Sequence, residues 1–141
     1  MYEFNYHRPA SLDEAAKIAA DAEDRKLLAG GMTLIPSMKL RLASPSDLVD
    51  LGGVDGLNTI SVSADTVSIG AMTRHVAVNT SADVQKAIPA LAALAGGIGD
   101  PSVRNRGTMG GSVANSDPAA DYPAGVLGLG ATIETNSRKI A

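Results

Sequence analysis

The spacing of hydrophobic and polar residues in the first third of the chain predicts short strands alternating with helices. Residues 2–6 alternate aromatic and polar side chains, which is typical of a strand. Ser11 and Glu14 then form a capping-box pattern, so we expect a helix over residues 12–23 with small apolar residues on one face. The other elements expected here are strands over residues 26–29 and 47–51 and a helix over residues 34–40.

The rest of the chain combines a hairpin pattern with a long alanine-rich stretch. Residues 60–62 and 67–69 alternate apolar and polar side chains around a short polar segment, which predicts a hairpin. Residues 72–95 predict a helix that is broken near Pro89. Residues 96–121 are rich in Gly, Asn, Asp, Pro and Ser, so we expect a long loop with a functional role. Further elements expected are a helix over residues 124–129 and the start of a strand over residues 131–135.

Composition and charge narrow the classes of function. The net charge is −3 and basic residues do not cluster, which argues against nucleic-acid binding. The chain has no cysteine, which excludes disulfides, cysteine-ligated zinc and iron–sulfur ligation within it and fits a reducing compartment. The sequence shows no signal-peptide pattern at its start and no apolar stretch of membrane-spanning length. We therefore expect a cytoplasmic protein without a membrane span.

The first segment with candidate chemistry is a strand that runs into Gly30 and Gly31, followed by Thr33 and a helix. Glycine adopts positive φ and permits close approach to the backbone, and successive amides around such a turn suit an anion. The free amides at the start of the following helix add further donors for an anion, so a diphosphate is the expected ligand. A plain strand-to-helix turn is the alternative, and it is favoured if the loop is taken alone. The dinucleotide fingerprint and the P-loop motif are both absent.

The second segment, residues 107–115, again pairs glycines with short polar side chains. Thr108, Ser112 and Asn115 supply donors and acceptors, and Asp121 supplies a carboxylate suited to ligand hydroxyls. Two such loops in one small chain are harder to explain as turns. We therefore expect amides of both loops to surround one diphosphate, with positive φ at Gly111.

Charged and titratable residues outside these loops carry weaker signals. Arg104 and Arg106 precede the second loop, and for either residue alone a solvated position is favoured. The alternative is that one of them sets the loop or faces a partner. His7 and His75 lack a metal-ligand or catalytic pattern, so surface or packing roles are favoured for both.

At its two glycine loops the sequence resembles the FAD-binding subunits of molybdenum hydroxylases. This family includes the medium subunit of aerobic carbon monoxide dehydrogenase and the flavin domain of xanthine dehydrogenase. The resemblance rests on residues 29–41 and 98–123 and extends over essentially the whole chain. It implies an α+β FAD-binding domain of the vanillyl-alcohol-oxidase/PCMH type, with FAD extended between two parts, here residues 1–55 and 56–141. Family members are longer, so the resemblance also implies a partial sequence that ends within the second part.

The resemblance implies FAD as the cofactor, with no catalytic residue and no metal ligand in this chain. Asp121 would bind a hydroxyl-bearing part of FAD. The implied cofactor contacts are Leu27, Leu28, Ala29, Gly30, Gly31, Met32, Thr33, Leu34, Thr108, Gly110, Gly111, Ser112, Asn115 and Asp121.

The resemblance further implies a flavoprotein component of a multi-subunit oxidoreductase. A molybdopterin-binding large subunit would oxidise the substrate, and an iron–sulfur small subunit would pass the electrons to FAD. The flavin would deliver them to an external acceptor, and this chain alone would have no substrate activity. Two alternatives stay open. One is a non-redox module that binds another nucleotide or phosphate compound through the same loops. The other is an interaction subunit that keeps the fold without the cofactor.

Overall fold

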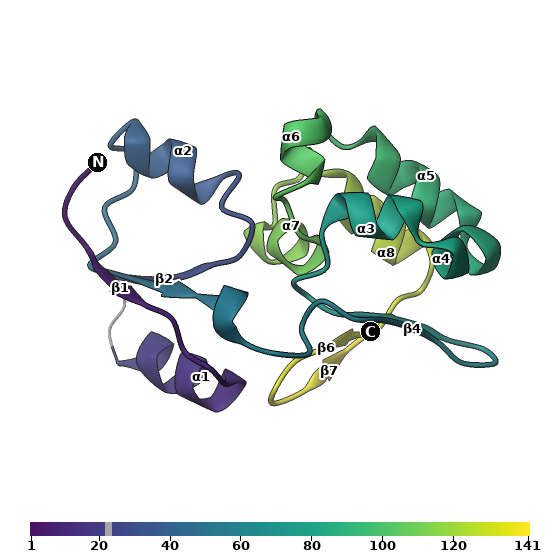
Figure 1. Ribbon diagram of the computed structural model, residues 1–141, viewed down its shortest axis with the longest axis horizontal. Helices are drawn as coiled ribbons and strands as arrows, with labels where there is room; N and C mark the ends of the chain where they lie inside the picture. The colour runs from purple at the N-terminus through teal and green to yellow at the C-terminus, as the bar shows by residue number, and fades with distance from the viewer. Residues whose placement is uncertain (22–23) are drawn as a thin grey trace.

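The computed structural model describes residues 1–21 and 24–141, which form two halves side by side (Figure 1). The first half contains a three-stranded sheet in the order β1-β3-β2, and both pairings are parallel. Helices α1 and α2 lie on opposite sides of this sheet (Figure 1). Its elements are β1 (Asn5–His7), α1 (Leu12–Ala20), β2 (Arg25–Leu28), α2 (Leu34–Lys39), β3 (Asp47–Asp50) and the 3-10 turn η1 (Leu51–Gly53).

The expected capping box at the start of α1 is confirmed. The Glu14 backbone N–H donates to Ser11 Oγ at 3.2 Å. The Glu14 carboxylate accepts from the backbone N–H of Ala10 at 3.0 Å, one residue earlier than in the standard motif. The helix fixes the connection between β1 and β2. The expected end of this helix, at residues 22–23, lies outside the described residues.

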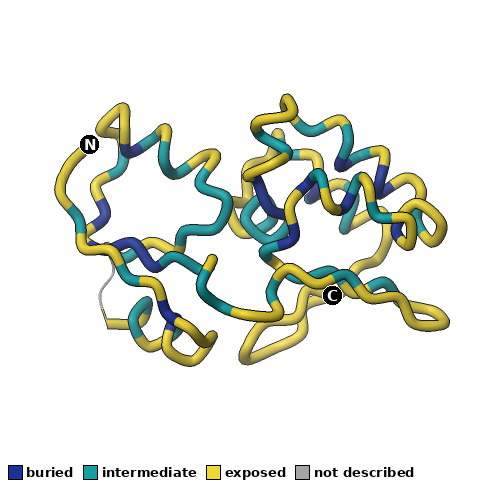
Figure 2. The backbone as a smooth tube through the Cα atoms, in the orientation of Figure 1, coloured by how far each residue is buried: buried dark blue, intermediate teal, exposed yellow. Residues whose placement is uncertain are grey.

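The second half packs helices against one antiparallel hairpin and carries a second antiparallel hairpin whose strands are exposed. Its core is formed mainly by aliphatic side chains from α3, α4 and α5, together with Tyr122, which is fully buried (Figure 2). The predicted hairpin over residues 60–69 is confirmed. The elements are β4 (Ile60–Val62), β5 (Val67–Ile69), α3 (His75–Thr80), α4 (Ala82–Ala87), α5 (Pro89–Gly97), α6 (Pro101–Arg104), α7 (Met109–Asn115), α8 (Asp121–Gly128), β6 (Ile133–Glu134) and β7 (Lys139–Ile140).

The alanine-rich stretch forms three helices rather than one helix with a single break. Pro89 starts α5, as the expected break near it suggests. A further break occurs at Ser81, whose hydroxyl accepts from the Val84 N–H at 3.3 Å and caps α4. A serine in an alanine-rich run can thus end one helix and begin the next, because its hydroxyl replaces a backbone acceptor.

The long loop expected over residues 96–121 is wrong, because this segment contains α6 and α7. Asp100 caps α6 by accepting from the Val103 N–H at 2.9 Å, and Pro101 occupies the first turn. Thr108 caps α7 by accepting from the Gly111 N–H at 3.1 Å. A segment rich in capping residues and glycines has the composition of a loop, although here these residues mark the starts of short helices.

Among the described residues, no helix combines the length and the apolar character needed to cross a bilayer.

A buried carboxylate at the start of β3 joins this strand to both of its neighbours in the parallel sheet. Asp47 Oδ1 on β3 lies 2.7 Å from His7 Nε2 on β1. Its Oδ2 accepts from Ser46 Oγ at 2.7 Å and lies 3.5 Å from Nε of Arg25 on β2. These interactions, led by the Ser46 and His7 hydrogen bonds, lower the pKa of Asp47 to about 2. The charged form of Asp47 therefore stabilises the register of this sheet.

Asp47→Asn is expected to remove a contribution to stability that depends on pH. An unfolded Asp has a pKa of about 3.9, so the folded carboxylate contributes fully above about pH 4. That contribution is lost as the pH falls toward about 2, the pKa in the folded protein. Thermal unfolding followed by circular dichroism should show a lower Tm for Asp47→Asn at pH 7 and a shrinking difference between pH 4 and 2. The exposed Asp65→Asn is the control, and a pH-independent Tm difference for Asp47→Asn would contradict this account.

Candidate functional site

The first glycine loop connects the carboxyl end of β2 to α2. Leu27 and Leu28 end the strand, residues 29–33 form the loop, and Leu34 begins the helix. Gly31 has a φ of 73°, which L-residues with a side chain rarely adopt. The expected positive φ is therefore present at Gly31, whereas Gly30 does not have it. The turn at Gly31 allows the Ile35 N–H to donate to the Gly31 carbonyl at 3.0 Å.

Backbone N–H groups of this loop are available to a ligand. Within the part of the chain that the structure describes, no protein group accepts a hydrogen bond from the N–H of Gly30, Gly31, Met32 or Thr33. Met32 and Thr33 are exposed, and Gly30 and Gly31 are half-buried. Helix α2 has only six residues, so an anion at this loop would meet the loop amides rather than a helix dipole.

The second glycine loop uses its amides differently. It runs beside residues 71–75 and donates from the Met109 N–H to the Thr73 carbonyl and from the Gly110 N–H to the Ala71 carbonyl, both at 2.9 Å. The N–H groups of Gly111 and Ser112 donate to the side chain and the carbonyl of Thr108. The expectation that amides of both loops surround one anion is therefore wrong for the second loop. Its amides are already bound within the protein.

Gly111 also differs from the expectation, because it is a helical residue of α7 and does not have positive φ. A Cβ at this position would lie 2.7 Å from Thr108 Oγ1 and 3.3 Å from the Ala29 Cβ. A glycine is needed here so that the cap of α7 and the first loop can approach. Thr108 is buried and caps this helix, whereas Ser112 and Asn115 present half-buried and exposed polar side chains.

The two loops are in direct contact. A Cβ on Gly30 would lie 2.3 Å from the Arg106 carbonyl oxygen and 2.7 Å from the Gly107 Cα. Backbone meets backbone at this point, which no side chain would permit. The two candidate loops therefore meet between the halves of the molecule (Figure 1).

Asp121 stands at the start of α8, beside a buried aromatic pair. The adjacent Tyr122 is fully buried and packs on His75, with ring centroids 5.3 Å apart. Burial lowers the pKa of His75, and the charge of Asp121 partly opposes this shift. Burial also raises the pKa of Tyr122. His75 packs in the core under Gly107, where a Cβ would lie 2.5 Å from its Nε2, so of the surface and packing roles expected for the two histidines it has the packing role.

A cavity of about 340 Å³ opens where the loops meet. It includes Ala29, Gly30 and Thr108 from the predicted set. Most of its wall comes from residues that the sequence did not single out. The carboxyl end of β3 was one available signal, because parallel strands place their carboxyl ends along one edge where ligands bind. These further lining residues are Arg8, Asp50, Leu51, Gly52, Val54, Asp55, Asn58, Met72 and Arg74.

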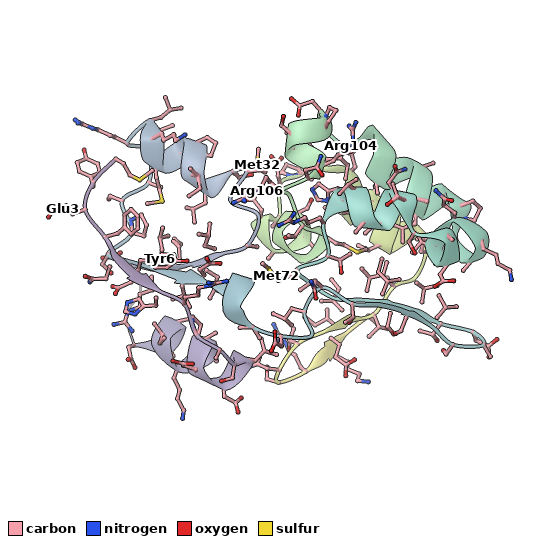
Figure 3. All side chains as sticks on the ribbon, in the orientation of Figure 1. Glu3, Tyr6, Met32, Met72, Arg104 and Arg106 are labelled. Carbon is pink, nitrogen blue, oxygen red and sulfur yellow. The ribbon has the colours of Figure 1, made fainter. Side chains whose placement is uncertain are left out.

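The two arginines before the second loop have different surroundings. Arg104 Nη1 donates to the carbonyls of Ile98 and Gly99, both at 3.0 Å, so Arg104 sets the path of the chain into α6. Arg106 lines the cavity, and Figure 3 shows it between the loop that carries Met32 and helix α7. Arg104 thus fixes the backbone ahead of the second loop, which is one of the roles that the sequence left open for these arginines. Arg106 faces the cavity.

Comparison with known proteins places this geometry among flavin-binding domains. Residues 2–140 match the family model described as the FAD binding domain in molybdopterin dehydrogenase. The carbon monoxide dehydrogenase medium chain of Hydrogenophaga pseudoflava is 46% identical over 122 residues, which are 86% of this chain and 42% of that protein. The xanthine dehydrogenase FAD-binding subunit of Escherichia coli O157:H7 is 32% identical over 139 residues, which are 97% of this chain and 47% of that one.

The likeness extends to solved structures. Reconstituted CO dehydrogenase from Oligotropha carboxidovorans superposes with a TM-score of 0.94 at 40% identity, over 99% of this chain and 51% of that chain. Quinoline 2-oxidoreductase from Pseudomonas putida 86 superposes with a TM-score of 0.93 at 40% identity, over 99% of this chain and 50% of that chain. The chain spans about half the length of the curated relatives that it matches.

Gly30→Ala is expected to destabilise the protein, because the added Cβ would overlap the Arg106 carbonyl oxygen. Overpacking of this kind costs about 1–3 kcal/mol. Gly128→Ala is the matched control, since a Cβ there has no atom within 4 Å and an alanine in helix α8 adds up to about 1 kcal/mol of stability. Urea unfolding would measure both free energies of unfolding. Equal effects of the two substitutions would show that the loops do not meet at Gly30.

Proposed function

Because the chain belongs to the family of FAD-binding domains of molybdopterin dehydrogenases, we propose that it binds FAD as the flavoprotein component of a multi-subunit molybdenum hydroxylase. The observation that carries the proposal is the row of available N–H groups from Gly30 to Thr33, next to the second loop. A diphosphate presents several strong acceptors within a short span, and such a row of donors suits it.

We propose contacts for the diphosphate and for the hydroxyl-bearing part of FAD. The N–H groups of residues 30–33 would donate to the diphosphate oxygens. Ser112 and Asn115 would add side-chain hydrogen bonds from α7, and Asp121 would accept from a hydroxyl of the ribose or the ribityl chain. Leu27 and Met32, 52% and 37% exposed, offer apolar surface beside the loop. Thr108, Gly110 and Gly111 would act through the shape of the second loop rather than through their amides.

In this proposal the cofactor lies between two parts of the chain, residues 1–55 and residues 56–141. The first part contributes the parallel sheet and the amide-lined loop. The second part contributes α7, α8 and most of the buried core. The contact at Gly30 holds the two parts at a fixed distance, so the chain positions the ligand without a large rearrangement.

The proposed role in electron transfer is supported by the family to which the chain belongs. Bound FAD would supply a two-electron centre between iron–sulfur clusters and an external acceptor. We propose an iron–sulfur small subunit as the electron donor and a molybdopterin-binding large subunit as the site of substrate oxidation. Relatives whose names designate a medium chain support this arrangement. The cytoplasmic location proposed for the complex is the expectation drawn from the sequence.

Binding of FAD to the purified full chain, followed by quenching of flavin fluorescence, tests the proposal. We expect Gly31→Ala to weaken binding about tenfold, because a side chain at positive φ costs about 1–2 kcal/mol and distorts the amide row. A Cβ there would also lie 2.9 Å from Ile35 Cγ1. Gly56→Ala is the matched control, with φ of 81° and no atom within 4 Å of the added Cβ.

Two results would contradict the proposal. One is a parent chain that binds no FAD under conditions in which it is folded. The other is ADP displacing FAD at equal concentration, which would indicate a general nucleotide site.

A further inference from the structure

The three guanidinium groups in the cavity wall lack a carboxylate partner among the described residues, and only that of Arg8 donates a hydrogen bond to the protein there. Among residues 1–21 and 24–141, no Asp or Glu oxygen lies within 4.0 Å of a side-chain nitrogen of Arg74 or Arg106. Both residues are exposed and both line the cavity together with Gly30. Their charges are therefore available to a ligand at that place.

The other charged groups of the cavity are two carboxylates and one further arginine. Asp50 accepts from the Tyr6 hydroxyl at 2.5 Å and from the Gly52 N–H at 2.8 Å. Arg8 donates to the Gly52 carbonyl at 3.3 Å. Asp55 lines the same cavity, and its negative charge offsets one positive charge of the wall. Three arginines against two aspartates leave one positive charge in excess, and none of the three arginines forms an ion pair among the described residues.

Backbone contacts hold both arginines beside the first loop. Arg74 forms an antiparallel bridge with Thr108, and this pairing fixes its main chain against the second loop. The carbonyl oxygen of Arg106 lies against Gly30, where a Cβ would come within 2.3 Å. The main chains of both residues are thus held by the second loop and its neighbours, Arg74 through Thr108 and Arg106 through the contact with Gly30.

We propose that Arg74 and Arg106 bind the phosphate oxygens of FAD from the cavity side and set a preference for a diphosphate ligand. The inference rests on the proposed function. The first loop offers N–H dipoles without a full charge, whereas a diphosphate is doubly negative. Guanidinium groups present planar forks of donors that match phosphate oxygens, so they complement the loop amides.

The test compares flavins with and without phosphate on variants of the full chain. Arg74→Gln and Arg106→Gln are each expected to weaken FAD binding about tenfold, the usual scale for a lost charge-assisted hydrogen bond. Binding of riboflavin, which has no phosphate, should not change. The salt dependence of FAD binding should also decrease in both variants, because fewer ionic contacts are formed. Arg106→Lys should recover part of the affinity.

Arg138→Gln is the control, because it removes the same charge at an exposed position outside the cavity wall. Circular dichroism melts establish that each variant is folded. FAD affinity within twofold of the parent in both variants and in the double variant would overturn the inference. So would an equal loss of riboflavin affinity, which would indicate a structural role. A parent chain that binds no FAD would instead count against the proposed function, so the two failures are distinguishable.

Discussion

The close approach of two backbone segments at Gly30 is the constraint on which the rest of this structure depends. The first loop and residues 106–107 meet where a single methyl group would not fit. This contact joins a parallel sheet to a separate helical core, and it brings the amide row, helix α7 and the cavity to one place. Glycine serves here through its lack of a Cβ rather than through positive φ. Gly31, one residue later, has positive φ, and this conformation turns the chain into α2.

The two glycine loops look alike in sequence, but their backbone N–H groups have different roles. The first leaves the N–H groups of residues 30–33 without a protein acceptor among the described residues. The N–H groups of the second loop donate hydrogen bonds to Thr73, Ala71 and Thr108, so this loop is a rigid support for the first. A segment whose N–H groups all have acceptors within the protein can hold a neighbouring segment, whose N–H groups have none, at a fixed distance.

Much of this architecture could be predicted from the chain, because the local signals were strong. The capping box at Ser11, the hairpin over residues 60–69 and the first glycine loop follow from side-chain pattern and from short-range hydrogen bonding. The pairing of residues 71–75 with the second loop could not be predicted, since it is a contact between segments distant in sequence. The same holds for Arg74 in the cavity. Residues 96–121 were misjudged because glycine, Asp100 and Thr108 suit loops and helix starts equally well.

The most direct test of this account is amide hydrogen exchange of the full chain, measured by NMR with and without FAD. The account predicts fast exchange at Gly30, Gly31, Met32 and Thr33 in the free protein and strong slowing of these four when FAD binds. The amides of Met109–Ser112 should be protected in both states, because their acceptors belong to the protein. Unchanged exchange at residues 30–33, with new protection at the second loop, would contradict the central claim.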